Sequence, residues 1–163
     1  NNFKMNKTNT INTSKGVELG LDWKPKDKKY GVDFDYTYTK SFDANNCKAG
    51  GCHVKSSKLG DAKVGVPRNA FVSNITHNTL PGLINSVQIK FMDETRYFGD
   101  GNNNFKDVIL EDYTTINLTS NYRLYDNYDL FFRAVNIFDD NYEQALGYSS
   151  AGRSFNLGFK RVY

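Results

Sequence analysis

The sequence lacks any long apolar run. No stretch of the 163 residues approaches the ~20 consecutive apolar residues that a membrane-spanning helix needs. Hydrophobic residues make up 39% of the chain and the mean hydropathy is −0.63, both low for a domain with a large buried core. The sequence therefore excludes a helical membrane protein and argues against a core-rich globular domain.

Concentrated charge and catalytic motifs are also missing. The formal net charge is only +3, and Lys and Asp are scattered, so no nucleic-acid-binding surface is expected. His53 and His77 are isolated, and there is no activated serine pattern, phosphate loop or metal cluster. We expect neither an enzyme nor a bound cofactor. Asp93, Asp100 and the asparagines at 102–104 could offer oxygen ligands to calcium, but they lack the spacing of a known calcium loop.

Cysteine is scarce, and both cysteines lie in one short segment. Cys47 and Cys52 enclose Lys-Ala-Gly-Gly between two strand candidates. We predict a local disulfide bond formed in an oxidising compartment. The alternative is a metal site with His53 as third ligand, but structural zinc sites usually need four ligands and no fourth is nearby.

Aromatic residues, in contrast, are abundant, and they alternate with small or polar residues. Aromatics make up 15% of the chain. In the last strand candidate, Phe155, Leu157, Phe159 and Tyr163 occupy every second position, with Ser, Asn, Gly and Lys between them. Such a two-residue period places one set on each face of a β-strand. An apolar face on one side and a polar face on the other is typical of a strand in an outer-membrane barrel.

The same alternation recurs along the chain, and no window shows a helical period over two turns. We predict an all-β fold: one antiparallel up-and-down sheet of about seven strands, an incomplete C-terminal fragment of a transmembrane β-barrel. The residues expected on its convex face are Leu19, Leu21, Val32, Phe34, Ile89, Phe91, Ile116, Leu118, Leu130, Phe132, Leu157 and Phe159.

Connection lengths alternate between short and long. The short ones are 25–29, 79–82 and 126–127, and the long ones are 42–64, 98–112 and 139–150. Because consecutive strands end on opposite sides of a meander, short connections gather at one rim and long ones at the other, as in outer-membrane barrels. Tyr and Trp are expected near both rims, as two interfacial belts: Trp23, Tyr30, Tyr125, Tyr128 and Tyr163 at the short-turn ends, and Tyr38, Tyr97, Tyr113 and Tyr142 at the long-loop ends.

Several motifs, in order, resemble TonB-dependent outer-membrane receptors. They are Ser14-Lys15-Gly16-Val17-Glu18, Val66-Pro67-Arg68, Tyr113-Thr114-Thr115-Ile116-Asn117-Leu118, Asn136-Ile137-Phe138-Asp139 with Tyr142, and Gly152-Arg153 before the final strand. The terminal residue is Tyr, where Phe is usual in the family. Arg161 departs from the pattern by taking a lipid-facing position near the periplasmic interface.

This resemblance implies that residues 1–163 are the C-terminal part of such a barrel, with the plug domain, the TonB-contacting segment and the N-terminal strands absent. It implies a location in the bacterial outer membrane, in contact with lipid. It also implies energy-coupled uptake of a scarce, bulky nutrient, with TonB as partner through the missing part.

The segments Arg96-Tyr97 and Gly147–Arg153 most resemble the cobalamin receptors, which implies a corrinoid ligand. By that resemblance Tyr148 faces the substrate, and Arg96 and Tyr97 contribute to the same surface. Two alternatives remain: a siderophore (ferric chelate) receptor of the same fold, or a secreted all-β structural or adhesive module.

Overall fold

The computed structural model describes residues 12–43, 65–98, 107–125 and 127–161. They form β-strands, turns and loops, and no helix among them is long and apolar enough to span a membrane. The strands are β1 (Asn12–Trp23), β2 (Tyr30–Asp43), β3 (Asn69–Leu80), β4 (Leu83–Met92), β5 (Thr95–Phe98), β6 (Asp107–Leu110), β7 (Tyr113–Tyr125), β8 (Tyr128–Val135), β9 (Glu143–Ala145), β10 (Tyr148–Ser149) and β11 (Ser154–Arg161).

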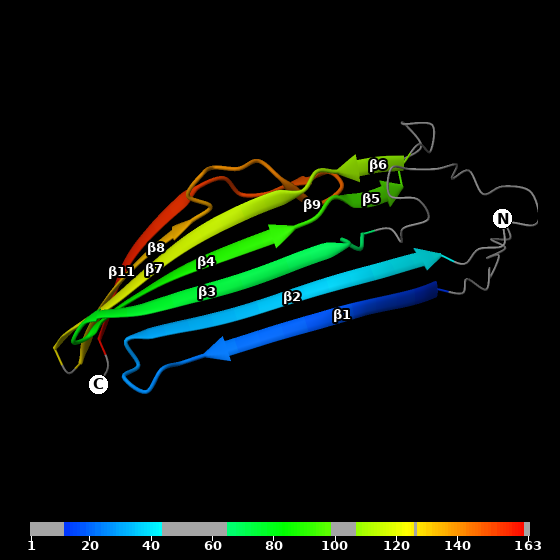
Figure 1. The fold of residues 1–163 in the computed structure, drawn as a ribbon. Helices are drawn as coiled ribbons and strands as arrows, with labels where there is room; N and C mark the ends of the chain where they lie inside the picture. The colour runs from blue at the N-terminus through cyan, green and yellow to red at the C-terminus, as the bar shows by residue number, and fades with distance from the viewer. Residues whose placement is uncertain (1–11, 44–64, 99–106, 126, 162–163) are drawn as a thin grey trace, which may run out of the picture.

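Seven strands form one curved antiparallel sheet in the order β1-β2-β3-β4-β7-β8-β11, shown in Figure 1. Every neighbour in the sheet is the next long strand in the chain, so the sheet is a meander without crossovers. The predicted all-β fold, the up-and-down topology and the number of strands are confirmed. The two smaller sheets, β5–β6 and β9–β10, are hairpins inside long connections, and the sequence analysis did not predict them.

The strand register places the twelve predicted apolar residues on one face. Leu21 pairs with Phe34, Ile89 with Ile116, and Leu157 with Phe132. The pairings of the other neighbouring strands place the apolar residues of every strand on this same face. Their common face is confirmed, and its position on the convex side stays a prediction.

The opposite face is polar. In β3, β4 and β7 its residues include Asn74, Gln88 and Asn117, which lie side by side in the register. Gln88 donates to Asn74 Oδ1 at 3.0 Å, and Asn117 donates to Gln88 Oε1 at 3.0 Å. A chain of side-chain amides therefore crosses three strands, and each amide is held by its neighbour. We call these three residues the amide ladder.

Glycine makes room for an aromatic ring on this polar face. Gly158 of β11 lies opposite Phe131 of β8, and a Cβ at Gly158 would meet the Phe131 ring at 2.0 Å. The ring therefore lies over the glycine backbone. This explains why the polar side of the last strand has a glycine in the middle.

The connections separate by length, as predicted. The turns at 24–29 and 81–82 and the facing ends of β7 and β8 lie at one end of the sheet, and the strand ends that flank the long connections lie at the other. We call these ends the short-turn rim and the long-loop rim. Pro81 and Gly82 form a two-residue turn in which Gly82 has a φ of +82°, close to the value that the third residue of a type II turn requires.

The aromatic belts stay a prediction, and the structure contradicts them at one position. Tyr125 and Tyr128 flank the last short turn, with their rings 6.5 Å apart, and the Arg161 guanidinium lies 5.5 Å from the Tyr128 ring. Tyr163 lies outside the described residues. At the long-loop rim the belt prediction was wrong for Tyr113, which is 7% exposed and pairs with Met92 on the polar face. Its ring is covered by Tyr142, so it is not available to lipid.

Candidate functional site

The long-loop rim is built around Asn136, which directly follows β8. Its side chain is 2% exposed, and its φ of +51° turns the chain out of the sheet. Its amide donates to Asp140 O at 2.9 Å, and its carbonyl accepts from Asp140 N at 3.1 Å. Its backbone N–H donates to Asn117 Oδ1 at 2.9 Å, which joins it to the amide ladder. Asn tolerates the left-handed conformation better than most residues, so the sequence supplies a suitable residue at this corner.

A second contact closes the base of the last long connection. Asp139 also has a positive φ, +59°, and its Oδ1 accepts from Arg153 N at 2.7 Å. The Arg153 guanidinium returns the contact by donating to Ile137 O at 3.3 Å. A Cβ at Gly152 would lie 2.9 Å from Asp139 Oδ1, so the glycine allows this close approach. The Asn136–Asp139 and Gly152–Arg153 motifs singled out in the sequence therefore meet as one structural clamp.

The two hairpins of the long-loop rim touch each other. Tyr97 in β5 donates its hydroxyl to Gln144 O in β9 at 3.2 Å, and β6 also lies against β9. Gly65, which follows the first long connection, donates its backbone N–H to Arg96 O at 2.8 Å. Residues far apart in the sequence thus form one assembly at the rim, which Figure 1 shows where β4 ends and β7 begins.

A groove lies between these hairpins. It has a volume of about 690 Å³. Its lining residues come from β6, the segment that leads into β7, and the β9–β10 hairpin: Val108, Ile109, Leu110, Glu111, Asp112, Asn141, Tyr142, Glu143, Leu146 and Ser149. The volume suits a ligand of the size of a small organic chelate, since ligand sites usually measure ~300–1,000 Å³.

The groove is acidic. Among the residues that the structure describes, its lining includes the acidic residues Glu111, Asp112 and Glu143 and no cationic residue. Glu143 Oε2 accepts from Gly147 N at 3.2 Å, which holds the turn of the β9–β10 hairpin. No group of three or more potential metal ligands occurs in the described parts of the chain. The acidic residues of the groove are suited to hydrogen-bond donors or cationic groups of a ligand.

One wall of the groove leads to an aromatic stack on the polar face. The rings of Tyr113 and Tyr142 lie 4.0 Å apart at an interplanar angle of 17°. Lys90 belongs to β4, and its Nζ lies 5.7 Å from the centroid of the Tyr113 ring. Cation–aromatic contact of this kind contributes roughly 0.5–1 kcal/mol at exposed sites. The stack anchors the groove to the sheet, because Tyr142 belongs to the loop and Tyr113 to β7.

The sequence-predicted site residues fall around this groove but not in its lining. Tyr148 follows Gly147 in the β9–β10 hairpin and is 76% exposed. Arg96 is 4% exposed, and Tyr97 is hydrogen-bonded to the neighbouring hairpin. The structure thus brings the three residues into the same group of hairpins at the long-loop rim, and the Tyr148 side chain among them is exposed. Cys47 and Cys52 lie outside the described residues.

Sequence reasoning missed the groove itself. The run Val108-Ile109-Leu110 was included in a long loop, although three consecutive apolar residues with two β-branched members are typical of a strand. Leu146-Gly147 between Ala145 and Tyr148 also has the composition of a tight hairpin turn. These two signals could have indicated the β5–β6 and β9–β10 hairpins.

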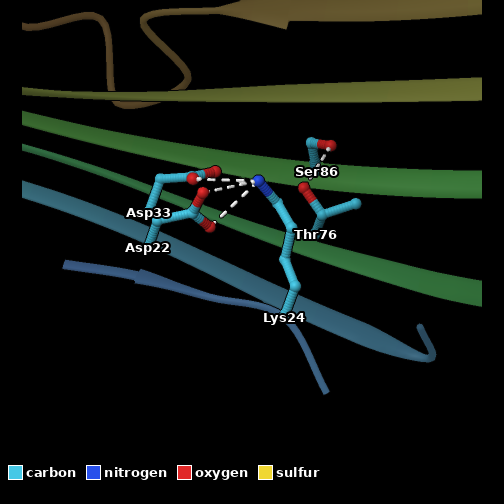
Figure 2. Close-up of polar contacts among 5 residues, drawn as sticks. All are labelled: Asp22, Lys24, Asp33, Thr76 and Ser86. Carbon is cyan, nitrogen blue, oxygen red and sulfur yellow. Dashed lines mark hydrogen bonds and ion pairs between the residues drawn. The ribbon is translucent and has the colours of Figure 1, made fainter. Parts of the chain in front are cut away.

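A smaller charged cluster lies at the short-turn rim, shown in Figure 2. Lys24 Nζ contacts Asp22 Oδ1 at 2.9 Å and Asp33 Oδ1 at 3.6 Å. Hydrogen bonding to Asp22, followed by the charges of both carboxylates, raises the pKa of Lys24 above its usual value. Beside it, the hydroxyls of Thr76 and Ser86 are hydrogen-bonded at 3.2 Å across β3 and β4. These groups are typical of a hydrated barrel wall.

Comparison with known proteins identifies the family of this sheet. A family model described as TonB dependent receptor-like, beta-barrel, matches residues 5–137. No curated protein matches the chain.

Solved structures share the fold. The siderophore receptor PiuA from Acinetobacter baumannii is 25% identical with a TM-score of 0.73, and the match covers 92% of this chain and 22% of PiuA. The ferric-catecholate import receptor Fiu from E. coli K12 is 17% identical with a TM-score of 0.76, with 92% and 21% covered. The pyoverdine receptor FpvA from Pseudomonas aeruginosa, solved with bound pyoverdine, is 15% identical with a TM-score of 0.71, with 93% and 22% covered.

The chain therefore spans about a fifth of the length of these receptors. Its meander, its rim asymmetry and its single apolar face agree with a section of their barrel wall. In such a barrel the apolar face meets lipid and the polar face lines the interior. The chain belongs to the TonB-dependent receptor β-barrel family of the bacterial outer membrane.

Proposed function

We propose that the complete protein is an energy-coupled outer-membrane receptor that imports a ferric siderophore. The observation that carries this proposal is the groove between the β5–β6 and β9–β10 hairpins, at the rim where barrels of this family have their extracellular loops. The names of the structurally similar receptors support the class of ligand, since PiuA, Fiu and FpvA are described as receptors for siderophores or ferric chelates.

The cobalamin prediction receives no support from these comparisons. It rested on the short segments Arg96-Tyr97 and Gly147–Arg153. In this chain the Gly147–Arg153 segment contains the β10 strand and part of the clamp at the base of the loop, which is a structural role. The siderophore alternative agrees with both the fold and the relatives, so we adopt it.

The charge of the groove narrows the class of siderophore. Three carboxylates in the lining would repel a strongly anionic chelate such as a bare ferric tris-catecholate. A chelate with amine, guanidinium or amide N–H groups would place donors toward Glu111, Asp112 and Glu143. We therefore propose a ferric chelate that presents hydrogen-bond donors or positive charge on one side, as peptide-based siderophores can.

Energy coupling requires a partner that this chain does not contact by itself. TonB would act through a part of the receptor that precedes the barrel wall, together with a plug domain inside the barrel. The polar face, with the amide ladder and Lys90, would line the interior in which the plug lies. No catalytic step is proposed, because import of this kind changes no covalent bond of the ligand.

An uptake experiment tests the proposal. The full-length receptor would be expressed in cells that lack their own siderophore and cobalamin receptors. These cells would be supplied with ⁵⁵Fe-loaded siderophores of different charge or with radiolabelled cyanocobalamin. We expect TonB-dependent uptake of a cationic or neutral peptide-based ferric siderophore, and none of cyanocobalamin. Uptake of cyanocobalamin alone would restore the corrinoid hypothesis.

We further propose that Tyr148 contacts the ligand directly, with Arg96 and Tyr97 supporting the same surface. Tyr148 is the exposed member of the three, and an aromatic face with a hydroxyl suits a large ligand that has both planar and polar parts. Arg96, being buried, would act by shaping the hairpin.

Replacing Tyr148→Ala in the full-length receptor should weaken siderophore binding about tenfold, the effect of losing a modest interface hot spot. Equilibrium binding to whole cells, at matched receptor amounts, measures it. The matched control is Tyr125→Ala, an exposed tyrosine at the opposite rim, which should bind normally. Unchanged affinity in the Tyr148 variant would remove that residue from the site without affecting the assignment of the ligand class.

A further inference from the structure

The β1–β2 strand pair separates its charges by face. On the polar face lie the carboxylates of Glu18, Asp22, Asp33 and Asp35. On the apolar face the charged residues among the described side chains are Lys15 and Lys40. A hydrated barrel interior solvates the carboxylates on the polar face. The two lysines, in contrast, lie on the side of the sheet that meets lipid.

The two lysines are also direct neighbours. Lys15 lies opposite Lys40 in the strand register, and both are exposed. Like charges directly opposite each other on one face of a sheet are destabilising. Neither lysine forms an ion pair within the described parts of the chain.

An acid at the same rim, Asp93, is already hydrogen-bonded to other groups. Asp93 follows β4, its Oδ2 accepts from Asn69 at 2.7 Å, and its Oδ1 accepts from Glu94 N at 3.1 Å. Asn69 is in turn bonded to the Tyr36 hydroxyl at 2.8 Å. These bonds hold Asp93 in its own cluster, and no ion pair joins it to either lysine among the described residues.

The position of the two lysines along the membrane normal indicates which anion could reach them. From the short-turn rim toward the long-loop rim, the residues of β1 on the apolar face are, in order, Trp23, Leu21, Leu19, Val17 and Lys15. Eight residues separate Trp23 from Lys15, about 26 Å along a strand, or about 20 Å along the membrane normal at a tilt of ~40°. The apolar band of such barrels is ~25 Å tall, so a long lysine stem extended away from the hydrocarbon brings its ammonium to the outer interface.

On β2 the same level is marked by an aromatic residue. Tyr38 pairs with Val17, and Lys40 is the next residue on this face toward the long-loop rim. A tyrosine at this level is typical of the interfacial belt, and a cation directly beyond it lies at the depth of lipid head groups. The two lysines therefore lie directly beyond the last apolar residues of β1 and β2.

We propose that Lys15 and Lys40 form a binding site for the phosphate of a lipid head group in the outer leaflet. A phosphate between the two ammonium groups would convert their mutual repulsion into two charge-assisted contacts. The acyl chains of the same lipid would lie along Val17, Leu19 and Tyr38, on the apolar surface below. This site is independent of the siderophore groove and does not depend on the transported ligand.

Native mass spectrometry of the full-length receptor in detergent tests this site. The added probes are lipid A with its phosphates and enzymatically dephosphorylated lipid A. We expect the Lys15→Gln, Lys40→Gln double variant to bind phosphorylated lipid A at least tenfold more weakly than the wild type. Dephosphorylated lipid A should bind all forms equally weakly, which distinguishes a phosphate site from acyl-chain contact alone.

Two further variants keep the test decisive. Lys26→Gln with Lys28→Gln removes the same charge from the short-turn rim and should bind as the wild type does. Lys15→Arg with Lys40→Arg retains the charge and should retain binding, even if the Gln pair assembles poorly. Equal affinity of the wild type and an assembled Gln pair, loss of affinity in the Arg pair, or an equal loss in the short-turn control would overturn the proposal.

Discussion

The two rims of the sheet are held together in different ways. At the short-turn rim the ion pairs join residues of one hairpin, as Arg123 with Asp129 and Lys24 with Asp22 and Asp33. At the long-loop rim the contacts join different connections, as Tyr97 with Gln144 and Gly65 with Arg96. A two-residue turn needs little help because its geometry sets its path, whereas a long connection gains a defined shape only from partners distant in sequence. The short-turn rim has contacts between hairpins as well, from Asn78 N to Lys29 O and from Arg123 N to Gly82 O, but its turns are short, whereas the shape of the groove depends on contacts between long connections.

The largest effect is expected for Asn136→Ala at the long-loop rim. The change removes two side-chain hydrogen bonds to Asp140 and places alanine at a positive φ. We expect a loss of roughly 2–4 kcal/mol, from buried groups left unpaired and from the left-handed backbone. The midpoint of guanidinium unfolding of the full-length receptor in detergent measures it. The control is Asn121→Ala, an exposed asparagine of β7, and equal stability of the two variants would show that Asn136 is not the anchor of this rim.

The cysteine segment provides a second test of the long-loop rim, since it connects β2 to β3, whose facing ends lie at that rim. A Cys47–Cys52 bond stays a prediction, and closing so short a loop would stabilise the loop by about 2 kcal/mol in the chain-entropy account. Intact cells treated with a membrane-impermeant maleimide should show no labelling until a reductant is added. The Cys47→Ser variant should leave Cys52 reactive from the start. Full labelling of the wild type without reductant would contradict the bond.

A pair of glycine substitutions compares the rims directly. Gly82 in the short turn and Gly147 in the β9–β10 turn have φ values of +82° and +81°. A Cβ at Gly82 would lie 3.1 Å from Arg123 O, whereas one at Gly147 would meet nothing within 4 Å. Both changes to alanine should cost about 1 kcal/mol through the backbone, with an added penalty at Gly82 alone. Unfolding midpoints of the two variants measure the difference, and a larger loss at Gly147 would contradict the account.

The smallest effect is expected for Arg123→Ala at the short-turn rim. Arg123 Nε contacts Asp129 Oδ1 at 2.9 Å, but the arginine side chain is 62% exposed. Exposed ion pairs usually contribute about 0.2–1 kcal/mol. The unfolding midpoint in low salt should fall only slightly, and high salt should abolish the difference from the wild type. A loss as large as that of Asn136→Ala would show that the two rims do not differ in the way described.

The sheet could be predicted from the sequence because each strand carries its own signal. The two-residue period is a local signal, seen in Leu19, Leu21 and Trp23 and again in Phe155, Leu157 and Phe159. The register between strands then follows, because a shift by one residue would move the apolar side chains to the polar face. The alternation of turn lengths then fixes the topology. The start of the third strand was predicted at 65 rather than Asn69, since Pro67 and Arg68 leave the boundary weakly marked.

The groove could not be predicted in the same way. It depends on contacts such as Tyr97 with Gln144 and Tyr113 with Tyr142, which no periodicity reports. Tyr113 shows the limit most clearly: its place at the long-loop end was right, but the register turns its ring to the polar face. The motif Asn136–Asp139 was visible as a family resemblance, while its role as a corner became clear only from the hydrogen bonds and positive φ values.

The unpaired edges of the sheet have a consequence for how the protein enters the membrane. Within the described residues, β1 and β11 each have a neighbour on one side only. Along each outer edge, every second backbone N–H and C=O points to the empty side. In hydrocarbon each such group costs several kcal/mol unless it is bonded. The apolar face of this segment therefore cannot be transferred into lipid step by step, and insertion has to wait until other strands of the receptor have closed both edges, which makes membrane entry of the barrel cooperative.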